Sequence, residues 1–300
     1  MKIFAPGYYE KFKCLANRCT HSCCVGWEID VDSDALSRYS ALGRAGEDIL
    51  STVDRSGECA RFMLCDNGRC KNLRDDGLCR IICRFGEEYL CDICREHPRF
   101  YNLTARGREV GVGASCEAAA DLILESDDYA DFTVIGDEKD GTCADISYDV
   151  CAQREKIYKI LSDRSIEYGN RLALIRKSFS VDPARISDGE WRSLISELEY
   201  LDGESRDLFL RYTDTAKVKD FRYAERVLAY FIYRHTGSAE SSEDFRLSLG
   251  LALFLERLFV SISQGAEREE ELIPLLVKLS EEIEYSEDNS ELIKNEFLFM

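Results

Sequence analysis

Apolar residues recur at helical spacing through the second half of the chain. In the segment 220–236, one stripe along a helix would contain four apolar residues: Phe221, Ala224, Leu228 and Phe231. Apolar positions three and four residues apart indicate an amphipathic helix. The same spacing predicts helices over 116–126, 149–165, 167–179, 188–201, 204–212, 245–262, 267–285 and 290–298.

The first 120 residues lack such long amphipathic segments. A short helix is predicted over 32–42, where Asp32 or Ser33 can act as the N-cap, and another near Glu87. The tripeptides DNG (66–68) and DDG (75–77) are typical of turns. We therefore predict a mainly α protein, in which an irregular, cysteine-rich N-terminal module packs on a helical C-terminal module.

Charge changes along the chain at nearly the same place. Residues 1–120 carry 17 basic and 18 acidic side chains, a net charge of −1. The remaining −17 of the chain's net charge of −18 lies after residue 120. Such acidity repels nucleic acid and favours a basic protein partner. We place the boundary between a cysteine-rich module of residues 1–125 and an acidic helical module of residues 126–300.

Neither a membrane span nor a signal peptide is expected. The longest apolar stretch, 247–262, is interrupted by Glu256 and Arg257 and is typical of a buried core helix. The N-terminal segment MKIFAPGYYEKFK has no apolar signal core, which predicts a cytoplasmic protein. Because the cytosol keeps thiols reduced, dense cysteines there favour metal binding or catalysis over disulfides.

Twelve of the 14 cysteines lie in the first 120 residues. Single cysteines are often small buried apolar residues, but packing alone does not explain this density. Disulfides are disfavoured by the reducing compartment, and the motif CDIC (91–94) lacks the preceding strand of a thioredoxin-like site. Metal ligation is the hypothesis that accounts for the whole set.

Close spacing lets two thiolates reach one ion. Three pairs have such spacing: Cys14 and Cys19, Cys19 and Cys23, and Cys91 and Cys94. Consecutive side chains diverge, so Cys23 and Cys24 are expected either to serve two centres or to include one spectator. With only three histidines in the chain, an all-cysteine site is favoured, and such a site suits both zinc and iron–sulfur clusters.

Taken together, several motifs resemble the flagellin lysine N-methylase family, and the N-terminal half resembles the wider group of CxxCxxCC zinc- or iron-chelating domains. The segments that carry the resemblance are YYEKFKCLANRCTHSCCVGWEIDVD (8–32), CARF (59–62), DGLCRI (76–81), LCDICREHPRF (90–100), SCEAAADLIL (115–124), AERVLAYFIYRH (224–235) and EIEYSEDN (282–289). The chain departs from the family by a first cysteine spacing wider than C-x2-C-x2-CC, and it is shorter than some members.

The resemblance implies a function and a set of ligands. It implies methylation of flagellin lysines that depends on S-adenosylmethionine, and an iron–sulfur cluster of the four-iron type, with zinc as the alternative. The metal-binding residues that it implies are Cys14, Cys19, Cys23, Cys24, Cys59, Cys79, Cys94 and Cys116. The alternative from another functional class is a non-enzymatic metal-binding module that is structural, senses redox state or docks a partner.

A methyl-donor site is not evident in the sequence. Common methyltransferases bind their donor at a glycine-rich turn after a buried parallel strand. The segment EVGVGAS (109–115) matches only superficially, because the preceding NLTARGR (102–108) is too polar for such a strand. A turn or strand end is the ordinary interpretation.

Tyrosines and carboxylates of the helical half are the candidates for a lysine-binding site. Tyr223, Tyr230 and Tyr233 could line a lysine channel, although core packing is favoured. Acidic residues at the rim of such a site would attract the substrate ammonium. Glu284 and Asn289 lie in the stretch that resembles the family's C-terminal motif and are the first positions to substitute.

Overall fold

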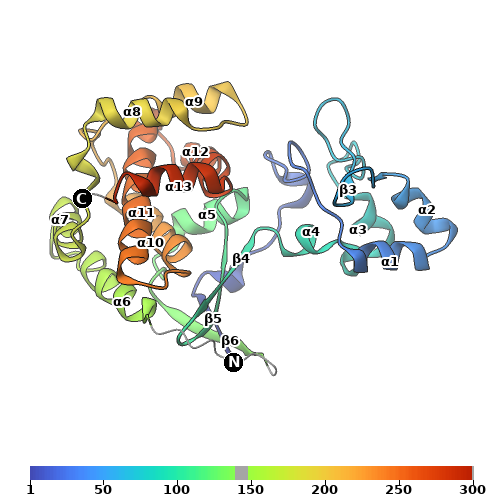
Figure 1. Cartoon of the computed structure of the whole chain (residues 1–300), viewed down its shortest axis with the longest axis horizontal. Coiled ribbons are helices and arrows are strands. Elements are labelled where there is room, and N and C mark those ends of the chain that lie inside the picture. The colour runs from blue at the N-terminus through green and yellow to red at the C-terminus, as the bar shows by residue number, and fades with distance from the viewer. Residues whose placement is uncertain (139–147, 299–300) are drawn as a thin grey trace. The chain divides into compact units, whose positions relative to one another are not determined.

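The computed structural model describes residues 1–138 and 148–298, which form two compact units (Figure 1). Residues 13–99 form one, here called the cysteine unit. Residues 1–12 combine with the chain from residue 100 onward in the other, here called the helical unit. The boundary predicted from composition, between residues 125 and 126, falls inside the helical unit, at the end of its first helix.

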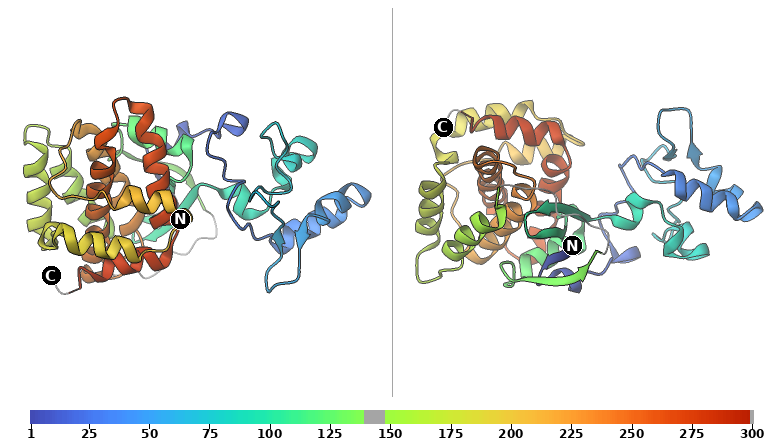
Figure 2. Two further views of the ribbon diagram at one scale, coloured as in Figure 1. Left: turned by 90° about the horizontal axis from the view of Figure 1, so that it is seen from above. Right: turned by 60° about the horizontal axis from the view of Figure 1, so that its bottom comes forward.

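Two long helices form the centre of the helical unit. Helices α10 (Phe221–Thr236) and α11 (Ser242–Ile262) lie side by side, and the other helices surround them (Figures 1 and 2). These others are α5 (Glu117–Glu125), α6 (Val150–Leu161), α7 (Tyr168–Phe179), α8 (Asp188–Glu197), α9 (Gly203–Phe209), α12 (Leu272–Leu279) and α13 (Glu287–Asn295). Each helix predicted after residue 115 is present, and the predicted core helix over 247–262 is buried within α11. The fold is mainly α, as predicted.

A small mixed sheet, which the sequence pattern did not predict, completes the helical unit. Its strand order is β4 (Arg99–Thr104), β5 (Gly107–Val112), β1 (Lys2–Pro6) and β6 (Phe132–Asp137). Strand β1 runs parallel to β5 and antiparallel to β6. Gly107 has a φ of +143°, and a Cβ atom there would lie 2.4 Å from the Lys2 carbonyl oxygen, so β5 can start only with glycine.

Polar N-caps fix where the helices of this unit begin. Side chains at six N-cap positions accept backbone N–H groups of the first turn, as such residues commonly do. They are Asp149, Ser187, Asp202, Asp220, Ser241 and Ser286. The core between the helices is aromatic: the rings of Trp191 and Phe254 are 4.2 Å apart, and Tyr212 stacks on Phe254.

The cysteine unit consists of short elements. Its helices are α1 (Ser33–Ala41), α2 (Arg44–Leu50), α3 (Arg80–Phe85) and α4 (Asp92–Glu96), and its strands are β2 (Val53–Asp54) and β3 (Arg61–Phe62). Asp32 caps α1 as predicted, and the second predicted start, at Glu87, is a single 3₁₀ turn, Glu87–Tyr89. Among the helices of both units, as far as the structure describes them, none is long and apolar enough to span a bilayer.

Candidate functional site

Five cysteine side chains gather in the core of the cysteine unit. Cys70 and Cys91 are buried among apolar residues that include Tyr39 and Phe62. Three half-buried cysteines pack against the same core: Cys24, Cys79 and Cys94. We call these five residues the thiol cluster.

Local backbone structure brings the members of the thiol cluster together. The backbone N–H of Cys70 donates a hydrogen bond of 2.8 Å to the carbonyl oxygen of Cys24, which joins two distant segments. Cys79 is the N-cap of α3, and Cys91 is the N-cap of α4. Cys94 lies one turn into α4, so the Cys-x-x-Cys spacing places it beside Cys91.

One hydrogen bond joins two thiols of the cluster, and another joins Cys23 to the cluster member Cys24. Cys94 donates to Cys91, which raises the pKa of Cys94 and lowers that of Cys91. Cys23 donates to Cys24, and this bond lowers the pKa of Cys24 to about 7. The conformation of this turn therefore brings the two thiols within reach of each other, and the expectation that they serve two centres or include one spectator stays a prediction.

The thiols of the cluster also influence one another electrostatically. Burial raises the pKa of Cys70, and the charges of Cys24 and Cys79 raise it further. The same two charges also raise the pKa of Cys94, after the hydrogen bond and burial. Since thiolates that repel one another gain most from a shared cation, the cluster has the donor chemistry of a metal site.

The convergence that a bound metal requires is not formed. Within residues 1–138 and 148–298, no three or more His, Cys, Asp or Glu side chains converge closely enough to hold an ion. The cysteines are free thiols, and Cys91 and Cys94 are joined by a hydrogen bond. In number, type and burial these residues fit an all-cysteine metal site, but the metal-binding module itself stays a prediction.

The structure places the eight predicted ligands in different surroundings. It brings together Cys24, Cys79 and Cys94 in the thiol cluster. Cys14 and Cys59 are exposed. Cys19 lines a separate cavity of about 290 Å³ in the same unit. The remaining two lie outside the cluster as defined: Cys23, which bonds to Cys24, and Cys116, the N-cap of α5 in the helical unit.

Two cluster members were absent from the predicted set. Cys91 could have been predicted as a member, because Cys91 and Cys94 form one of the three closely spaced pairs. For Cys70 the sequence contains no such signal, since its neighbour in the site, Cys24, is 46 positions away.

A buried carboxylate network lies in the helical unit. Residues Ser280–Glu284 form a short π-helix, an irregularity that is frequent at functional sites. The side chain of Glu284 is inaccessible, accepts hydrogen bonds of 3.0 and 3.1 Å from the hydroxyl of Tyr230, and lies 3.3 Å from Nε2 of His235. Burial alone would raise the pKa of Glu284, but the neighbouring His235 and the positive charge of Arg234 hold it below its usual value.

These positions do not form the acidic rim that was expected. Glu284 is buried, and Asn289 is fully buried as well. The Asn289 amide bonds to both the N–H and the carbonyl of Glu199, which is a structural role. Tyr230 and Tyr233 pack in the core, as favoured from the sequence.

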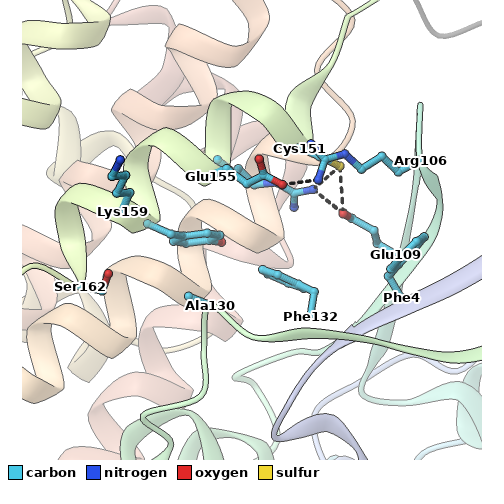
Figure 3. Close-up of a pocket in the computed structure, with 11 residues that line it drawn as sticks. Phe4, Arg106, Glu109, Ala130, Phe132, Cys151, Glu155, Lys159 and Ser162 are labelled. Atoms are coloured by element: carbon cyan, nitrogen blue, oxygen red, sulfur yellow. Dashed lines mark hydrogen bonds and ion pairs between the residues drawn. The ribbon is translucent and has the colours of Figure 1, made fainter.

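A cavity of about 410 Å³ opens in the helical unit between α6 and the sheet (Figure 3). Its lining includes a buried ion pair between Glu109 on β5 and Arg154 on α6. The segment 109–115, which superficially resembled a donor-binding turn, forms the end of β5 and the turn that follows it. Sequence reasoning named this segment but missed that Glu109, its first residue, faces a cavity.

Comparisons with known proteins give the functional context. The chain is 24% identical over 133 residues, 42% of its length, to the flagellar biosynthetic protein FliU of Salmonella muenchen, of which the match covers 79%. Over the same length it is 24% identical to the lysine-N-methylases of Salmonella typhimurium and Salmonella choleraesuis. The resemblance to lysine N-methylases is confirmed.

The likeness to the lysine N-methylases is partial. The matched region spans 33% of the length of each of these two enzymes. No protein-family profile matches the chain. No solved structure matches it either.

Proposed function

We propose that this chain is a protein-lysine N-methyltransferase that acts on flagellin and takes its methyl group from S-adenosylmethionine. The observation that carries the proposal is the similarity over 133 residues to two proteins named lysine-N-methylase and to a flagellar biosynthetic protein. Since the match spans a third of each lysine-N-methylase, the activity and the substrate are inferred from that shared part.

We further propose that the thiol cluster binds an iron–sulfur cluster of the four-iron type, with zinc as the alternative metal. Cys24, Cys79 and Cys94 would be three of the ligands, because they are both implied by the resemblance and brought together by the fold. Cys70 or Cys91 would be the fourth. A bound cluster would supply redox-active iron and would cross-link chain segments that have little regular structure.

The substrate amine sets a requirement on the helical unit. Only the neutral amine of a lysine has the lone pair that attacks a methyl sulfonium, and an ordinary lysine, with a pKa of about 10.4, is almost fully protonated at neutral pH. The acidic chain after residue 120 would attract the ammonium, and a less polar interior would favour loss of its proton. Salt should weaken this attraction, since exposed charges are screened within about 10 Å at 0.1 M.

Mass spectrometry of flagellin co-expressed with the chain tests this function. We expect methyl groups on flagellin lysines with the unchanged chain and with Cys65→Ser, which replaces an exposed cysteine outside the thiol cluster. We expect loss of methylation with Cys94→Ser. Unmethylated flagellin in the presence of metal-loaded chain and S-adenosylmethionine would contradict the proposal.

A second function is favoured by one observation. The thiol cluster is part of the core of a compact unit of its own, as in a structural metal-binding module. In that case the chain would retain metal, but it would leave flagellin unmethylated in the same experiment. Iron, acid-labile sulfide and zinc, quantified together after purification without oxygen, identify the metal under either function.

A further inference from the structure

The cavity in the helical unit has two walls of different composition (Figure 3). One face of α6, with residues spaced three or four apart, forms the first wall: Cys151, Arg154, Glu155, Tyr158 and Lys159, followed by Ser162. The sheet side contributes Phe4 from β1, Glu109 from β5 and Phe132 from β6. The cavity therefore lies within a single unit of the protein.

A charged pair is buried at this cavity. Nη2 of Arg154 lies 2.5 and 2.6 Å from the two carboxylate oxygens of Glu109, and the side chains are only 3% and 6% exposed. The Cys151 thiol donates a hydrogen bond of 3.5 Å to the same carboxylate. A buried ion pair is seldom more stabilising than apolar side chains of similar volume, so its position at a cavity suggests a role in binding.

Other charged groups stand at the exposed edge. Arg106 donates a hydrogen bond to Glu155, and these side chains are 42% and 64% exposed. Lys159 is exposed on the same face of α6. The lining is also aromatic: it includes the rings of Phe132 and Tyr158, which lie 5.9 Å apart.

These groups define the chemistry of a ligand. Three cationic side chains exceed two carboxylates, so a matching ligand should carry an anionic group, which a lone alkylammonium such as a lysine side chain lacks. A simple anion would leave the aromatic wall without a function. A ligand with a zwitterionic amino-acid head and an aromatic ring satisfies both kinds of surface, and the volume lies within the roughly 300–1,000 Å³ of small-molecule sites.

We propose that this cavity binds S-adenosylmethionine. The excess of cationic groups, which includes Arg106 and Lys159, suits its carboxylate, and Glu155 suits its ammonium. The faces of Phe132 and Tyr158 suit the adenine ring and the positively charged sulfur. This inference rests on the proposed function, because it assigns the methyl-donor site of that enzyme to residues of the helical unit.

A matched pair of lysine substitutions on one helix tests the site. Lys159→Glu changes a residue that lines the cavity, whereas Lys156→Glu makes the same change on α6 at a residue outside the lining. Binding of S-adenosylmethionine to the full chain, purified without oxygen, is measured by equilibrium dialysis. We expect Lys159→Glu to weaken binding by about tenfold or more and Lys156→Glu to leave it within about twofold.

Filling the cavity provides a second, independent variant. Ala130→Trp adds a large side chain to the lining and should reduce binding of S-adenosylmethionine by at least about tenfold, while circular dichroism checks that the helices remain. If the unchanged chain binds no S-adenosylmethionine, or if Lys159→Glu and Ala130→Trp both bind as tightly as the unchanged chain, the inference is wrong. Displacement of the bound donor by N-acetyl-lysine amide at equal affinity would also overturn it, since that would mark the cavity as a lysine site.

The failure of this inference and the failure of the proposed function give different results. If the chain binds the donor and Lys159→Glu weakens that binding, but flagellin stays unmethylated, the cavity assignment stands and the proposed function falls. If flagellin is methylated while neither substitution changes donor binding, the function stands and the donor site lies elsewhere.

Discussion

Cys65 and Cys70 are five positions apart and look equivalent in the sequence, yet Cys65 is exposed while Cys70 is buried beside Cys24 and Cys79. The difference arises from the hydrogen bond between the backbones of Cys70 and Cys24, a pairing that no local pattern reveals. The sequence therefore predicted that cysteines gather, and it named three members of the thiol cluster. It could not separate buried from exposed thiols, because that depends on contacts between distant segments.

Serine substitutions should separate the thiol cluster from the other cysteines. We expect Cys79→Ser and Cys94→Ser to lose most of the bound metal, since thiolates are the ligands in an all-cysteine site. Cys65→Ser should retain it. Metal content is measured after purification without oxygen. Equal metal content in all three variants would show that the thiol cluster is not the binding site.

The two cysteines beyond residue 120 are expected to be spectators of metal binding. Cys151 hydrogen-bonds to Glu109 in the helical unit. Cys143 lies outside the residues that the structure describes. Serine at either position should leave the metal content of the chain unchanged, which the same analysis would check.

Breaking the buried ion pair between Arg154 and Glu109 should lower the free energy of unfolding. Arg154→Met leaves the Glu109 carboxylate buried without its partner, and we expect the free energy of unfolding to fall by about 3 kcal/mol or more. Adding Glu109→Gln should recover part of the loss, because it removes the uncompensated charge. Urea unfolding of the single and double variants measures both changes, and additive losses would mean that the two groups do not interact.

At the scale of elements, the sequence was informative wherever a helix was long and had one apolar face, as for α10 and α11. It missed the sheet for a physical reason. Strand β5 is short, contains two glycines and places Glu109 toward a cavity, so it lacks the apolar run of a buried parallel strand. Its pairing with β1 joins residues about a hundred positions apart, and the cavity that depends on this sheet could not be predicted either.

The N-cap of α10 should contribute a stability that depends on pH. Asp220 accepts the backbone N–H of Arg222, and hydrogen bonding to Arg222 lowers the pKa of Asp220. A carboxylate with a lowered pKa in the folded state stabilises the fold above its unfolded pKa, and this contribution disappears as the pH falls through the folded value. Asp220→Ala should therefore cost about 1 kcal/mol at pH 7 and progressively less below about pH 4.

Unfolding by urea at several pH values checks this prediction. Asp207→Ala, an exposed position within α9, serves as the control and should change the free energy of unfolding little at any pH. If Asp220→Ala lowers the free energy of unfolding by the same amount down to pH 3, the charge of the Asp220 cap does not contribute to stability.

At the scale of the whole molecule, two compact units with separate cores carry different candidate chemistry: thiols in residues 13–99, and a charged, aromatic cavity in the remainder. Metal removal should therefore affect the two units unequally. We expect backbone hydrogen exchange to rise mainly in residues 13–99, because irregular chain depends most on cross-linking by a metal. Exchange measured by mass spectrometry before and after chelation tests this, and an equal rise in α10 and α11 would contradict it.

The parallel pairing of β1 with β5 also orders events during synthesis. Strand β1 emerges before β5 and has no parallel partner until residues 107–112 follow, and by then the whole of residues 13–99 has been made. Domains fold as units as the chain grows, so the cysteine unit can fold, and take up the metal that we propose for it, before the sheet closes. Closing the sheet then joins the ends of a chain that is already compact, which loses less entropy than closing a long flexible loop. Metal supply during translation would in this way set how readily the sheet that lines the cavity forms.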